Sequence, residues 1–365
     1  MYISENSGHH RAALAIERSL SLLDVAVQSR SVNSFNYTNP LLERIINRTY
    51  MAVIKRRPEV WEYLYDNPVV VKKSQRLKEY IHKYSSGKMQ ALLDDFRPDV
   101  VVCTQAFPCG IVSDMKRTSG LTVPLIGVLT DYAPHSYWVY KDVDAYIVPS
   151  EETGQKLIQN GVSDTKIRPL GIPVDPRFFT KHNREELFKK YSLNPGKPVV
   201  LVMGGGQGLG PMKKLVPLVD KSRLDLQIIV ITGKNKRLYK SLANEIRYFK
   251  KKALLFEFSE KIDEFMEIAS LIITKPGGLT TAEAMSKGLP MVIIHPLPGQ
   301  ETMNTRFLLD NGLAVKANDE KDAIVLLEEL LSNEEKLNNM KTEIRKKAKY
   351  DSSLKIARFV LEAAS

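Results

Sequence analysis

A proline–glycine–glycine turn between a strand and a helix is the strongest candidate for a binding site. In the segment 271–290, LIITKPGGLTTAEAMSKGLP, an apolar strand ends at Lys275 and a helix is expected from near Leu279. Backbone N–H groups at such a helix start, together with the helix dipole, suit a diphosphate. The N–H groups expected to point outward are those of Gly277, Gly278, Leu279 and Thr280. The alternative is a plain strand–turn–helix in which glycine serves only the geometry of the turn.

A carboxylate lies one helical turn beyond this turn, on the same side of the helix. Glu283 could accept hydrogen bonds from both ribose hydroxyls of a nucleotide. It could equally be a glutamate near the helix start that only complements the dipole. The residue is therefore a candidate ribose ligand with a structural alternative.

A second glycine-rich loop follows another apolar strand. Residues 203–211 read MGGGQGLGP and contain Gly205 and Gly206, but no glycine triplet has the G-x-G-x-x-G spacing of dinucleotide-binding folds. A loop that faces a phosphate or a sugar is the better prediction. No acidic residue follows at the expected end of the next strand, which weakens a nicotinamide interpretation.

The N-terminal segment SENSGHHRAALAI carries two adjacent histidines. We expect a loop that contains Gly8, then His9 and His10, then a helix from about Arg11. The positive end of the helix dipole would keep a histidine there neutral, so it could act as a base. The alternative is a histidine that is solvent-exposed or only caps the helix.

Another candidate loop, TDYAPHSYW at 130–138, follows the apolar run LIGVL. Its Asp131, His135 and Trp138 would lie at the carboxyl end of a strand, where open α/β sheets bind ligands. The loop alone is a weak signal, because aromatic and polar residues are common in such loops.

A basic stretch at 41–88 has eleven Lys and Arg against five Asp and Glu. Its net charge, eleven minus five or +6, is over half of the chain's net charge of +11. Its apolar residues recur at helical spacing and its tyrosines lie among the basic residues, which suits an anionic membrane surface. An amphipathic helix packed on the first sheet with a solvated basic face explains the same pattern equally well.

The composition is that of a globular protein. The chain has 365 residues, enough for two α/β domains, and its two cysteines, Cys103 and Cys109, show no disulfide or metal-ligand pattern. No apolar run is long enough to cross a membrane and no signal peptide is evident. We therefore expect a cytoplasmic protein that is peripheral on the inner face of the cell membrane. The opening residues 1–3 are short for a first strand, so the start lies upstream or the strand is frayed.

These candidate sites need an alternating α/β framework to position them. Apolar runs predict strands at 99–103, 125–129, 145–148, 199–203, 227–231, 271–274 and 291–294, with helices between them, for example at 150–159, 262–269 and 280–287. Such alternation predicts parallel sheets. The expected domains are 1–175 and 195–345, with a C-terminal helix in 346–365 that could belong to either and is expected to pack back on the first.

In this order and spacing, the segments resemble the lipid glycosyltransferases of the GT-B fold, in glycosyltransferase family 28. These are the monogalactosyldiacylglycerol synthases and bacterial diacylglycerol glucosyltransferases, with the peptidoglycan N-acetylglucosaminyltransferase as a more distant relative. NSGHHRAA and TDYAPHSYW resemble the motifs of the first domain, and GIPVDPRF the interdomain segment. ITKPGGLTTAEAMSKGLPMVI and PGQETMN resemble the donor site. The resemblance covers nearly the whole chain.

The resemblance implies two Rossmann-like domains with an interdomain cleft. It also implies an inverting transfer of a hexose from a UDP-sugar to diacylglycerol or a related lipid, with no cofactor and no obligatory metal. His9, which follows Gly8, would be the general base. The acceptor residues would be Asp131, His135 and Trp138. The donor residues would be Gly205, Gly206, Phe258, Ser259, Lys275, Pro276, Gly277, Gly278, Leu279, Thr280, Glu283, Gln300, Glu301 and Asn304.

Within that set, each part of the donor has its own expected contacts. Phe258 and Ser259 would lie against the uracil and Glu283 against the ribose. Gln300 and Glu301 would contact the sugar hydroxyls. Glucose and galactose differ at one hydroxyl, and these two residues suit either sugar.

Two rival functions remain open. A UDP-sugar epimerase of the same fold would need catalytic carboxylates and no lipid surface, so the basic stretch argues against it. A catalytically inactive, nucleotide-sugar-binding protein that docks on membranes would keep Glu283 but would not need His9. No nucleic-acid recognition motif accompanies the basic excess, so a nucleic-acid partner is not expected.

Overall fold

The computed structural model describes residues 1–5, 7–40 and 86–365. The basic stretch at 41–88 is predicted either to bind a membrane surface or to form a helix packed on the first sheet. Its residues 41–85 lie outside the described residues. No helix within the described ranges combines the length and the apolar composition that crossing a membrane requires.

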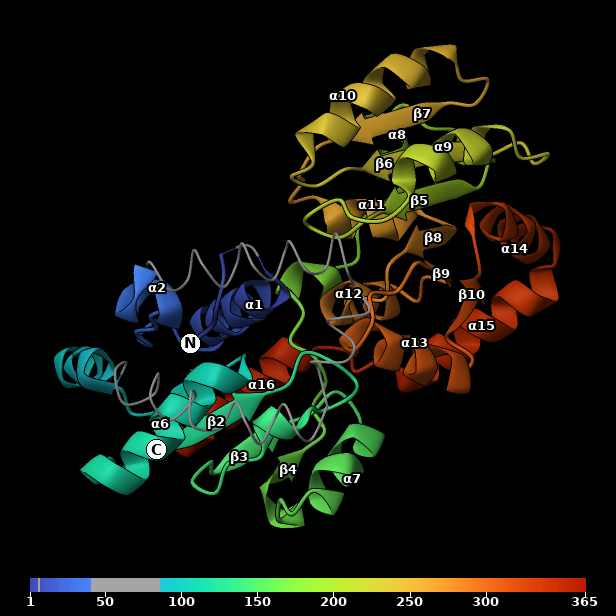
Figure 1. Cartoon of the computed structure of the whole chain (residues 1–365). Helices are drawn as coiled ribbons and strands as arrows, with labels where there is room; N and C mark the ends of the chain where they lie inside the picture. Colours follow the sequence, from blue (N-terminus) through green and yellow to red (C-terminus); the bar gives the residue numbers. More distant parts are fainter. Residues whose placement is uncertain (6, 41–85) are drawn as a thin grey trace. The chain divides into compact units, whose positions relative to one another are not determined.

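The chain forms two compact units, each built on a parallel sheet (Figure 1). The first unit comprises residues 1–176, 298–300 and 351–365, and the second comprises 177–297 and 301–350. Residues 177–194, which we expected to connect the domains, thus belong to the second unit.

The second unit has a six-stranded sheet in the order β10-β9-β8-β5-β6-β7. Numbered along the chain within this unit, the strands have the 3-2-1-4-5-6 order of dinucleotide-binding folds. Successive strands are added on one side of β5 up to β7 and then on its other side from β8 onward, so the strand order reverses between β5 and β8. The strands are β5 (Val199–Met203), β6 (Gln227–Ile231), β7 (Ala253–Phe256), β8 (Leu271–Thr274), β9 (Met291–Ile294) and β10 (Ala314–Ala317). The central strands are entirely buried, as expected for a sheet covered on both faces.

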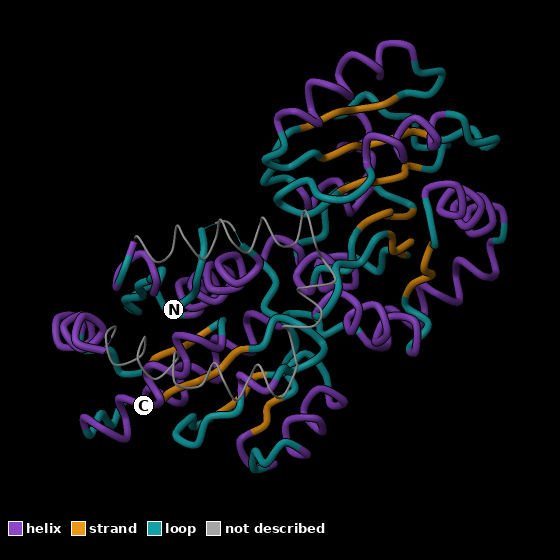
Figure 2. The backbone as a smooth tube through the Cα atoms, in the orientation of Figure 1, coloured by secondary structure: helices purple, strands orange, loops and turns teal. Residues whose placement is uncertain are grey.

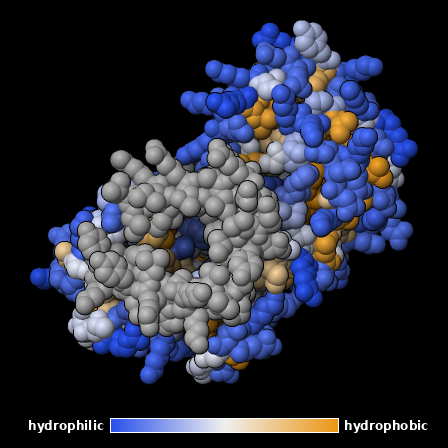
Figure 3. Space-filling view, viewed as in Figure 1, coloured by the Kyte–Doolittle hydropathy of each residue, from blue (hydrophilic) through white to orange (hydrophobic). Residues whose placement is uncertain are grey.

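Helices lie on both sides of this sheet (Figure 2). They are α8 (Arg184–Lys190), α9 (Met212–Asp220), α10 (Lys236–Glu245), α11 (Ile262–Ile268), α12 (Gly278–Ser286), α13 (Gln300–Asp310), α14 (Glu320–Ser332) and α15 (Glu334–Lys347), with 3₁₀ turns η3 (Pro176–Phe179) and η4 (Ile246–Tyr248). Among the coloured residues in the view of Figure 3, most are hydrophilic, and the apolar ones form small separate patches.

The first unit has a parallel sheet in the order β1-β2-β3-β4. Its strands are β1 (Val101–Cys103), β2 (Leu125–Val128), β3 (Ala145–Ile147) and β4 (Ile167–Arg168). Its helices are α1 (Gly8–Leu23), α2 (Ser34–Thr38), α6 (Ala106–Ser119), α7 (Glu151–Gln159) and α16 (Ser352–Ala364), with η1 (Ser136–Trp138) and η2 (Asp164–Lys166). Residues 86–96 are also helical.

Two apolar cores cover this first sheet. On one face, Ile16 of α1 and Ile356 of α16 pack with Ile126 and Ile147 of the sheet. The other core contains Ile111 and Met115 of α6. The C-terminal helix α16 therefore packs against α1 in the first unit.

The opening residues pair as a very short strand. The Met1 ammonium donates to Val102 O and Thr104 N donates to Met1 O, while Tyr2 forms a parallel bridge with Asn33. Residues 1 and 2 thus lie between β1 and residues 32–34. The α/β fold with parallel sheets is confirmed, but the sequence reading missed β4, β7 and β10.

Candidate functional site

The two glycine-rich loops of the second unit meet where the strand order reverses. The loop 204–210 follows β5, and the turn at Lys275 follows β8, the neighbouring strand. Thr274 Oγ1 donates to Met203 O at 2.8 Å, and a Cβ built on Gly210 would lie 3.8 Å from Lys275 Cγ. Open α/β sheets bind ligands at this edge, outside the carboxyl ends of the strands.

The first glycine loop needs glycine because other backbone crowds it. Gly208 has a φ of +58°, and a Cβ there would lie 1.9 Å from Thr232 O. Asn235 Nδ2 donates to Gly208 O at 3.0 Å, and Lys234 N donates to Gly206 O at the same distance. The loop after β5 is therefore fixed against the turn that follows β6. Gly205 and Gly206 remain partly exposed on it.

The helix α12 begins at Gly278, with Gly277 as its N-cap, one residue earlier than expected. Thr281 N makes the first helical bond, to Gly277 O at 3.0 Å, so the N–H groups of residues 278–280 precede the helical ladder. One prediction was wrong. Gly277 N donates to Lys275 O at 2.9 Å, because the chain turns tightly there, and so it does not point outward. Gly277 and Thr280 are partly exposed at this helix start.

Two buried polar side chains lie at this turn: Asn304 contacts the turn at 275–277, and Glu283 belongs to the helix that follows it. Asn304 is fully buried and donates from Nδ2 to Pro276 O at 3.0 Å. Glu283 is 1% exposed on α12. Leu279 and Gly278 are also buried, so they offer a ligand only backbone groups.

An ion pair links the turn to the start of α13. Lys275 Nζ lies 2.6 Å from Glu301 Oε1, and both side chains are nearly buried. Glu301 Oε2 also accepts from Leu297 N at 2.8 Å. The two predicted donor residues therefore form one charge-compensated unit. Gln300, the first residue of α13, is partly exposed.

The predicted uracil contact lies after β7. Phe258 is 40% exposed, which leaves its ring available to stack on a planar base. Lys234 Nζ lies 5.9 Å from the centroid of that ring. The sequence analysis did not select Lys234, which lies between β6 and α10 beside this ring.

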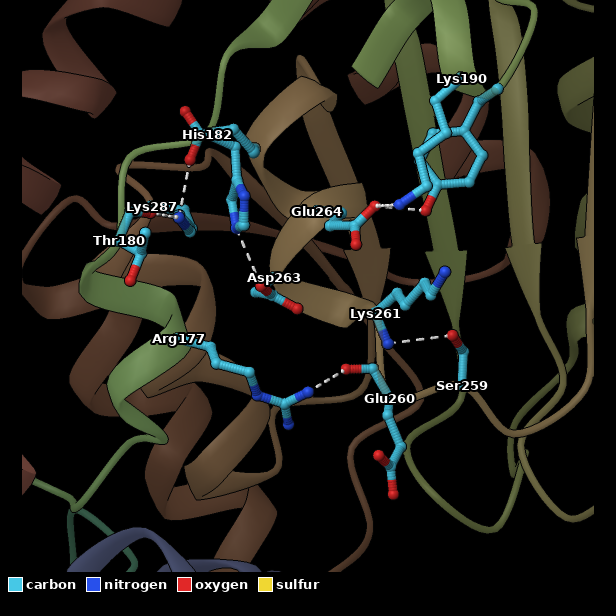
Figure 4. Close-up of polar contacts among 12 residues, drawn as sticks. Arg177, Thr180, His182, Lys190, Ser259, Glu260, Lys261, Asp263, Glu264 and Lys287 are labelled. Atoms are coloured by element: carbon cyan, nitrogen blue, oxygen red, sulfur yellow. Dashed lines mark hydrogen bonds and ion pairs between the residues drawn. The ribbon is translucent and has the colours of Figure 1, made fainter. Parts of the chain in front are cut away.

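Polar contacts fix the loop that carries Phe258 (Figure 4). Arg177 donates to Glu260 O at 2.9 Å, and Ser259 Oγ accepts from Lys261 N at 3.1 Å. Because its hydroxyl accepts from the loop backbone, Ser259 stabilises the loop itself.

The start of the second unit is held to α11 by further polar pairs (Figure 4). His182 Nε2 lies 2.9 Å from Asp263 Oδ2, and Lys190 Nζ lies 2.5 Å from Glu264 Oε2. Lys287 donates to Thr180 O at 2.9 Å. These contacts attach residues 177–190 to the elements that follow β7.

In the first unit, both histidines lie inside the first turn of α1. The helix begins at Gly8 rather than near Arg11, because the Ser7 hydroxyl caps it by accepting from His10 N at 3.2 Å. The expected loop position of the histidines was therefore wrong. His10 stacks on Tyr2, with ring centroids 4.2 Å apart, and its Nδ1 lies 3.2 Å from Glu5.

His9 is oriented by two groups of the sheet edge. Its Nδ1 lies 2.8 Å from Thr104 O and 3.0 Å from Thr130 Oγ1. A carbonyl oxygen only accepts, so Nδ1 carries the proton and Nε2 keeps its lone pair in the neutral ring. Sequence reasoning missed both threonines, which lie 95 and 121 residues away along the chain.

The environment of His9 favours the neutral imidazole. Burial lowers the pKa of His9, while the Asp131 carboxylate and the bond to Thr104 oppose that shift. Neutrality was expected from the helix dipole; the cause that lowers the pKa here is burial. Asp131, from the predicted acceptor loop, is thus close enough to His9 to act on it electrostatically.

The rest of the acceptor loop divides into an exposed part and a buried part. His135 is partly exposed, and its ring centroid lies 6.2 Å from that of Trp138. Trp138 is 4% exposed and belongs to the core, so its indole supports the loop from inside. The Thr153 hydroxyl anchors the same loop by donating to Tyr132 O at 2.8 Å.

Comparison with solved structures gives the fold. MurG of Acinetobacter baumannii is similar with a TM-score of 0.58 and 16% identity, over 78% of this chain and 79% of that one. UDP-GlcNAc 2-epimerase from Neisseria meningitidis, bound to UDP-GlcNAc, has a TM-score of 0.63 and 12% identity over 99% and 98%. The fold is GT-B.

Comparison of sequences gives the family. Residues 9–174 match the family described as monogalactosyldiacylglycerol (MGDG) synthase, and residues 199–356 match the glycosyltransferase family 28 C-terminal domain. A processive diacylglycerol beta-glucosyltransferase of Bacillus subtilis is 30% identical over 86% of this chain and 81% of its own. The corresponding protein of Bacillus licheniformis is 29% identical over the same shares. The chain therefore belongs to the glycosyltransferase family of the monogalactosyldiacylglycerol synthases and processive diacylglycerol beta-glucosyltransferases.

Proposed function

We propose that this protein transfers a hexose, glucose or galactose, from a UDP-sugar to the hydroxyl group of diacylglycerol. Family membership supports the reaction class, and the names of the Bacillus relatives describe beta-glucosyl transfer to diacylglycerol. In UDP-glucose the sugar is linked α to the diphosphate. A β product therefore requires inversion, as in a single displacement assisted by one base.

The observation that carries this proposal is the anchoring of His9. Its Nδ1 is committed to Thr104 O, which leaves Nε2 as the basic atom. Burial lowers its pKa, so the ring is neutral at physiological pH. A neutral, oriented imidazole is the group that removes a proton from an attacking alcohol.

The proposed reaction has one proton transfer and one substitution. His9 Nε2 takes the proton of the lipid hydroxyl as the oxygen attacks the anomeric carbon. The bond from that carbon to the UDP oxygen breaks, and the electron pair leaves with UDP. The start of α12 would stabilise this charge, because the N–H groups of residues 278–280 precede the helical ladder.

The donor's other parts have candidate partners around the same sheet edge. We propose that Phe258 stacks on the uracil, with Lys234 beside it, and that Glu283 binds the ribose. Gln300 and Glu301, at the start of α13, would contact the sugar hydroxyls. The pairing of Glu301 with Lys275 would fix the direction of its carboxylate.

We further propose that the protein works at the anionic inner face of the cell membrane. The support is the excess of basic residues at 41–88. Sedimentation with vesicles should increase with anionic lipid content and decrease with salt. Equal sedimentation with neutral and anionic vesicles at low salt would contradict this location.

The direct test of the proposed function is a product assay. Purified protein is incubated with diacylglycerol-containing liposomes and either UDP-glucose or UDP-galactose, and UDP and lipid products are both followed. We expect β-hexosyl groups on diacylglycerol in equal amount to the released UDP. Interconversion of UDP-sugars without glycolipid would support the epimerase alternative. UDP binding without any product would support an inactive binding protein.

A further inference from the structure

The connection between α10 and β7 combines basic and aromatic residues. Residues 246–252 read IRYFKKK, with one arginine and three lysines and no Asp or Glu. They form the 3₁₀ turn η4 and the residues that lead into β7 (Figure 1). We call this segment the basic loop. Protein surfaces usually intersperse both signs of charge, so a run of one sign with aromatic rings in it points to an anionic partner.

The basic loop lies at the amino-terminal edge of the second sheet. Ile228 N donates to Lys252 O at 2.9 Å, where β6 and β7 begin to pair. The two donor turns follow β5 and β8, at the carboxyl ends of those strands. Because the strands of this sheet are parallel, the basic loop and the donor turns lie at opposite edges. The basic loop is therefore not part of the proposed donor site.

Lys251 fixes the basic loop to the end of α9. Its backbone N–H donates to Asp220 Oδ1 at 2.9 Å, and its ammonium donates to Asp220 O and Ser222 O, each at 2.7 Å. These bonds bring residues 220–222, with the exposed Lys221, beside the loop. One lysine thus holds the loop in place and its neighbours are left for another role.

The neighbours of Lys251 are exposed. Arg247, Lys250 and Lys252 are all on the surface, and Tyr248 is 86% exposed. Among the described residues, no carboxylate forms an ion pair with any of these three cations. The loop therefore presents cations and an aromatic ring to solvent.

Carboxylates on the flanking segments have other partners. Asp220 accepts from Lys251 N, and Asp225 Oδ2 lies 2.8 Å from Lys197 Nζ. Glu245 accepts from a serine hydroxyl of its own helix at 3.3 Å. Counter-ions for the loop must therefore come from outside this part of the second unit.

We propose that the basic loop is a docking site of the second unit for an anionic lipid bilayer. Arg247, Lys250 and Lys252 would lie at the phosphate headgroups. The ring of Tyr248 would enter the interface, where amphipathic aromatic rings are enriched. The inference rests on the proposed membrane location and deepens it, with residues outside 41–88.

Nucleic acid is the other polyanion that such a loop could meet. Proteins that bind single strands combine a basic groove with several stacking rings. In the basic loop only Tyr248 is largely exposed, whereas Phe249 is half-buried. The proposed acceptor, diacylglycerol, resides in a bilayer, so the bilayer is the better partner.

The first experiment measures binding of the full chain to phosphatidylcholine vesicles with and without phosphatidylglycerol. The variant R247Q/K250Q/K252Q should bind the anionic vesicles at least about tenfold more weakly than the wild type. Its binding should also depend less on salt, because fewer charges take part. Unchanged affinity for anionic vesicles in a folded variant would overturn the proposal.

A matched control removes the same amount of charge elsewhere in the second unit. Lys181, Lys189 and Lys321 are exposed, and K181Q/K189Q/K321Q should bind vesicles like the wild type. An equal loss in this control would show that only net charge matters and would overturn the proposal. A single-stranded RNA is the second probe. A loop variant that loses affinity for RNA but not for vesicles would assign the loop to nucleic acid instead.

A fluorophore at position 248 tests contact with the bilayer directly. Cys103 and Cys109 are buried, so a thiol-reactive, environment-sensitive dye should label Tyr248→Cys selectively. Its emission should shift to shorter wavelength when anionic vesicles are added. The same dye on Lys189→Cys should not shift. An unshifted emission at position 248 would overturn the proposal.

Turnover in detergent micelles separates this inference from the proposed hexosyl transfer. With diacylglycerol in neutral micelles, R247Q/K250Q/K252Q should turn over like the wild type, and on anionic vesicles it should be several-fold slower. A wild type that docks through the loop but makes no glycolipid would contradict the transfer alone. A loop variant as active as the wild type on anionic vesicles would contradict the docking site alone.

Discussion

His9 Nδ1 lies 2.8 Å from the backbone carbonyl oxygen of Thr104, and this contact decides which ring nitrogen can act as a base. The carbonyl holds the proton on Nδ1, so Nε2 is the atom that can accept one. Because the partner is a backbone group, no substitution of a side chain removes it. The roles of the surrounding side chains can therefore be tested one at a time.

The pH dependence of kcat/KM should show a base with a lowered pKa. Protonation of His9 removes the lone pair of Nε2, so activity falls as the pH falls through its pKa. Burial lowers that pKa, so the acid-side midpoint should lie below ~6.5, the ordinary value for histidine. A midpoint at or above ~7 would contradict this reading.

The Asp131→Asn variant should move that midpoint further in the acid direction. The Asp131 carboxylate favours the protonated imidazole, so its removal lowers the pKa of His9 further. Comparison of the two pH profiles measures the shift. A midpoint that rises in the variant would mean that Asp131 does not act on His9 in this way.

Thr130→Val should lower turnover by roughly three- to tenfold, the scale of one net hydrogen bond. The Thr130 hydroxyl lies 3.0 Å from His9 Nδ1 and helps to orient the ring. Thr130→Ser keeps the hydroxyl and should retain most of the activity. A positioning role also requires that UDP affinity stays unchanged in both variants. Equal loss in the Val and Ser variants would point to packing.

Glu283→Ala should weaken UDP binding by roughly 1–3 kcal/mol, the scale of losing a charged hydrogen-bond partner. Glu283 is 1% exposed, so Glu283→Gln serves as the control that keeps the side-chain volume. Calorimetry measures the UDP affinity of both variants, and the unfolding midpoint of each shows whether it is folded. Unchanged UDP affinity in a folded Glu283→Ala protein would remove this residue from the donor site.

Gly277→Ala separates ligand binding from folding. A Cβ at Gly277 would have no atom within 4 Å, and its φ of −66° suits any residue. The variant should therefore fold with nearly unchanged stability. If the diphosphate lies against this backbone, the added methyl group should weaken UDP binding at least about tenfold. Full UDP affinity would place the diphosphate elsewhere.

The strands that could be predicted from the sequence are the ones that the sheets bury. Each appears as a short apolar run, as in Val199–Met203, where every residue is buried. The three strands that were missed, β4, β7 and β10, all lie at sheet edges. In β4 and β10, partial exposure permits the polar residues Arg168 and Lys316, which interrupt the apolar pattern. β7 reads ALLF and is only partly buried, so this reason does not apply to it.

The candidate site was only partly predictable. The donor turn carries its own local signal, because glycine and a helix start are adjacent in the sequence. The start of α1 also has such a signal in Ser7, a residue type that commonly caps helices, although it was not used. The contacts of Thr104 and Thr130 with His9 depend on tertiary packing across the sheet edge, which no local pattern encodes.

The most direct test of the account is the turnover of His9→Ala beside that of His10→Ala, with UDP affinity measured for each. Loss of the base should lower turnover of His9→Ala by ~10²–10⁴-fold while UDP binding stays nearly intact. His10 stacks on Tyr2 and pairs with Glu5, so His10→Ala should have a milder effect. Near-full turnover in His9→Ala, with or without a loss in His10→Ala, would contradict the assignment of His9 as the general base.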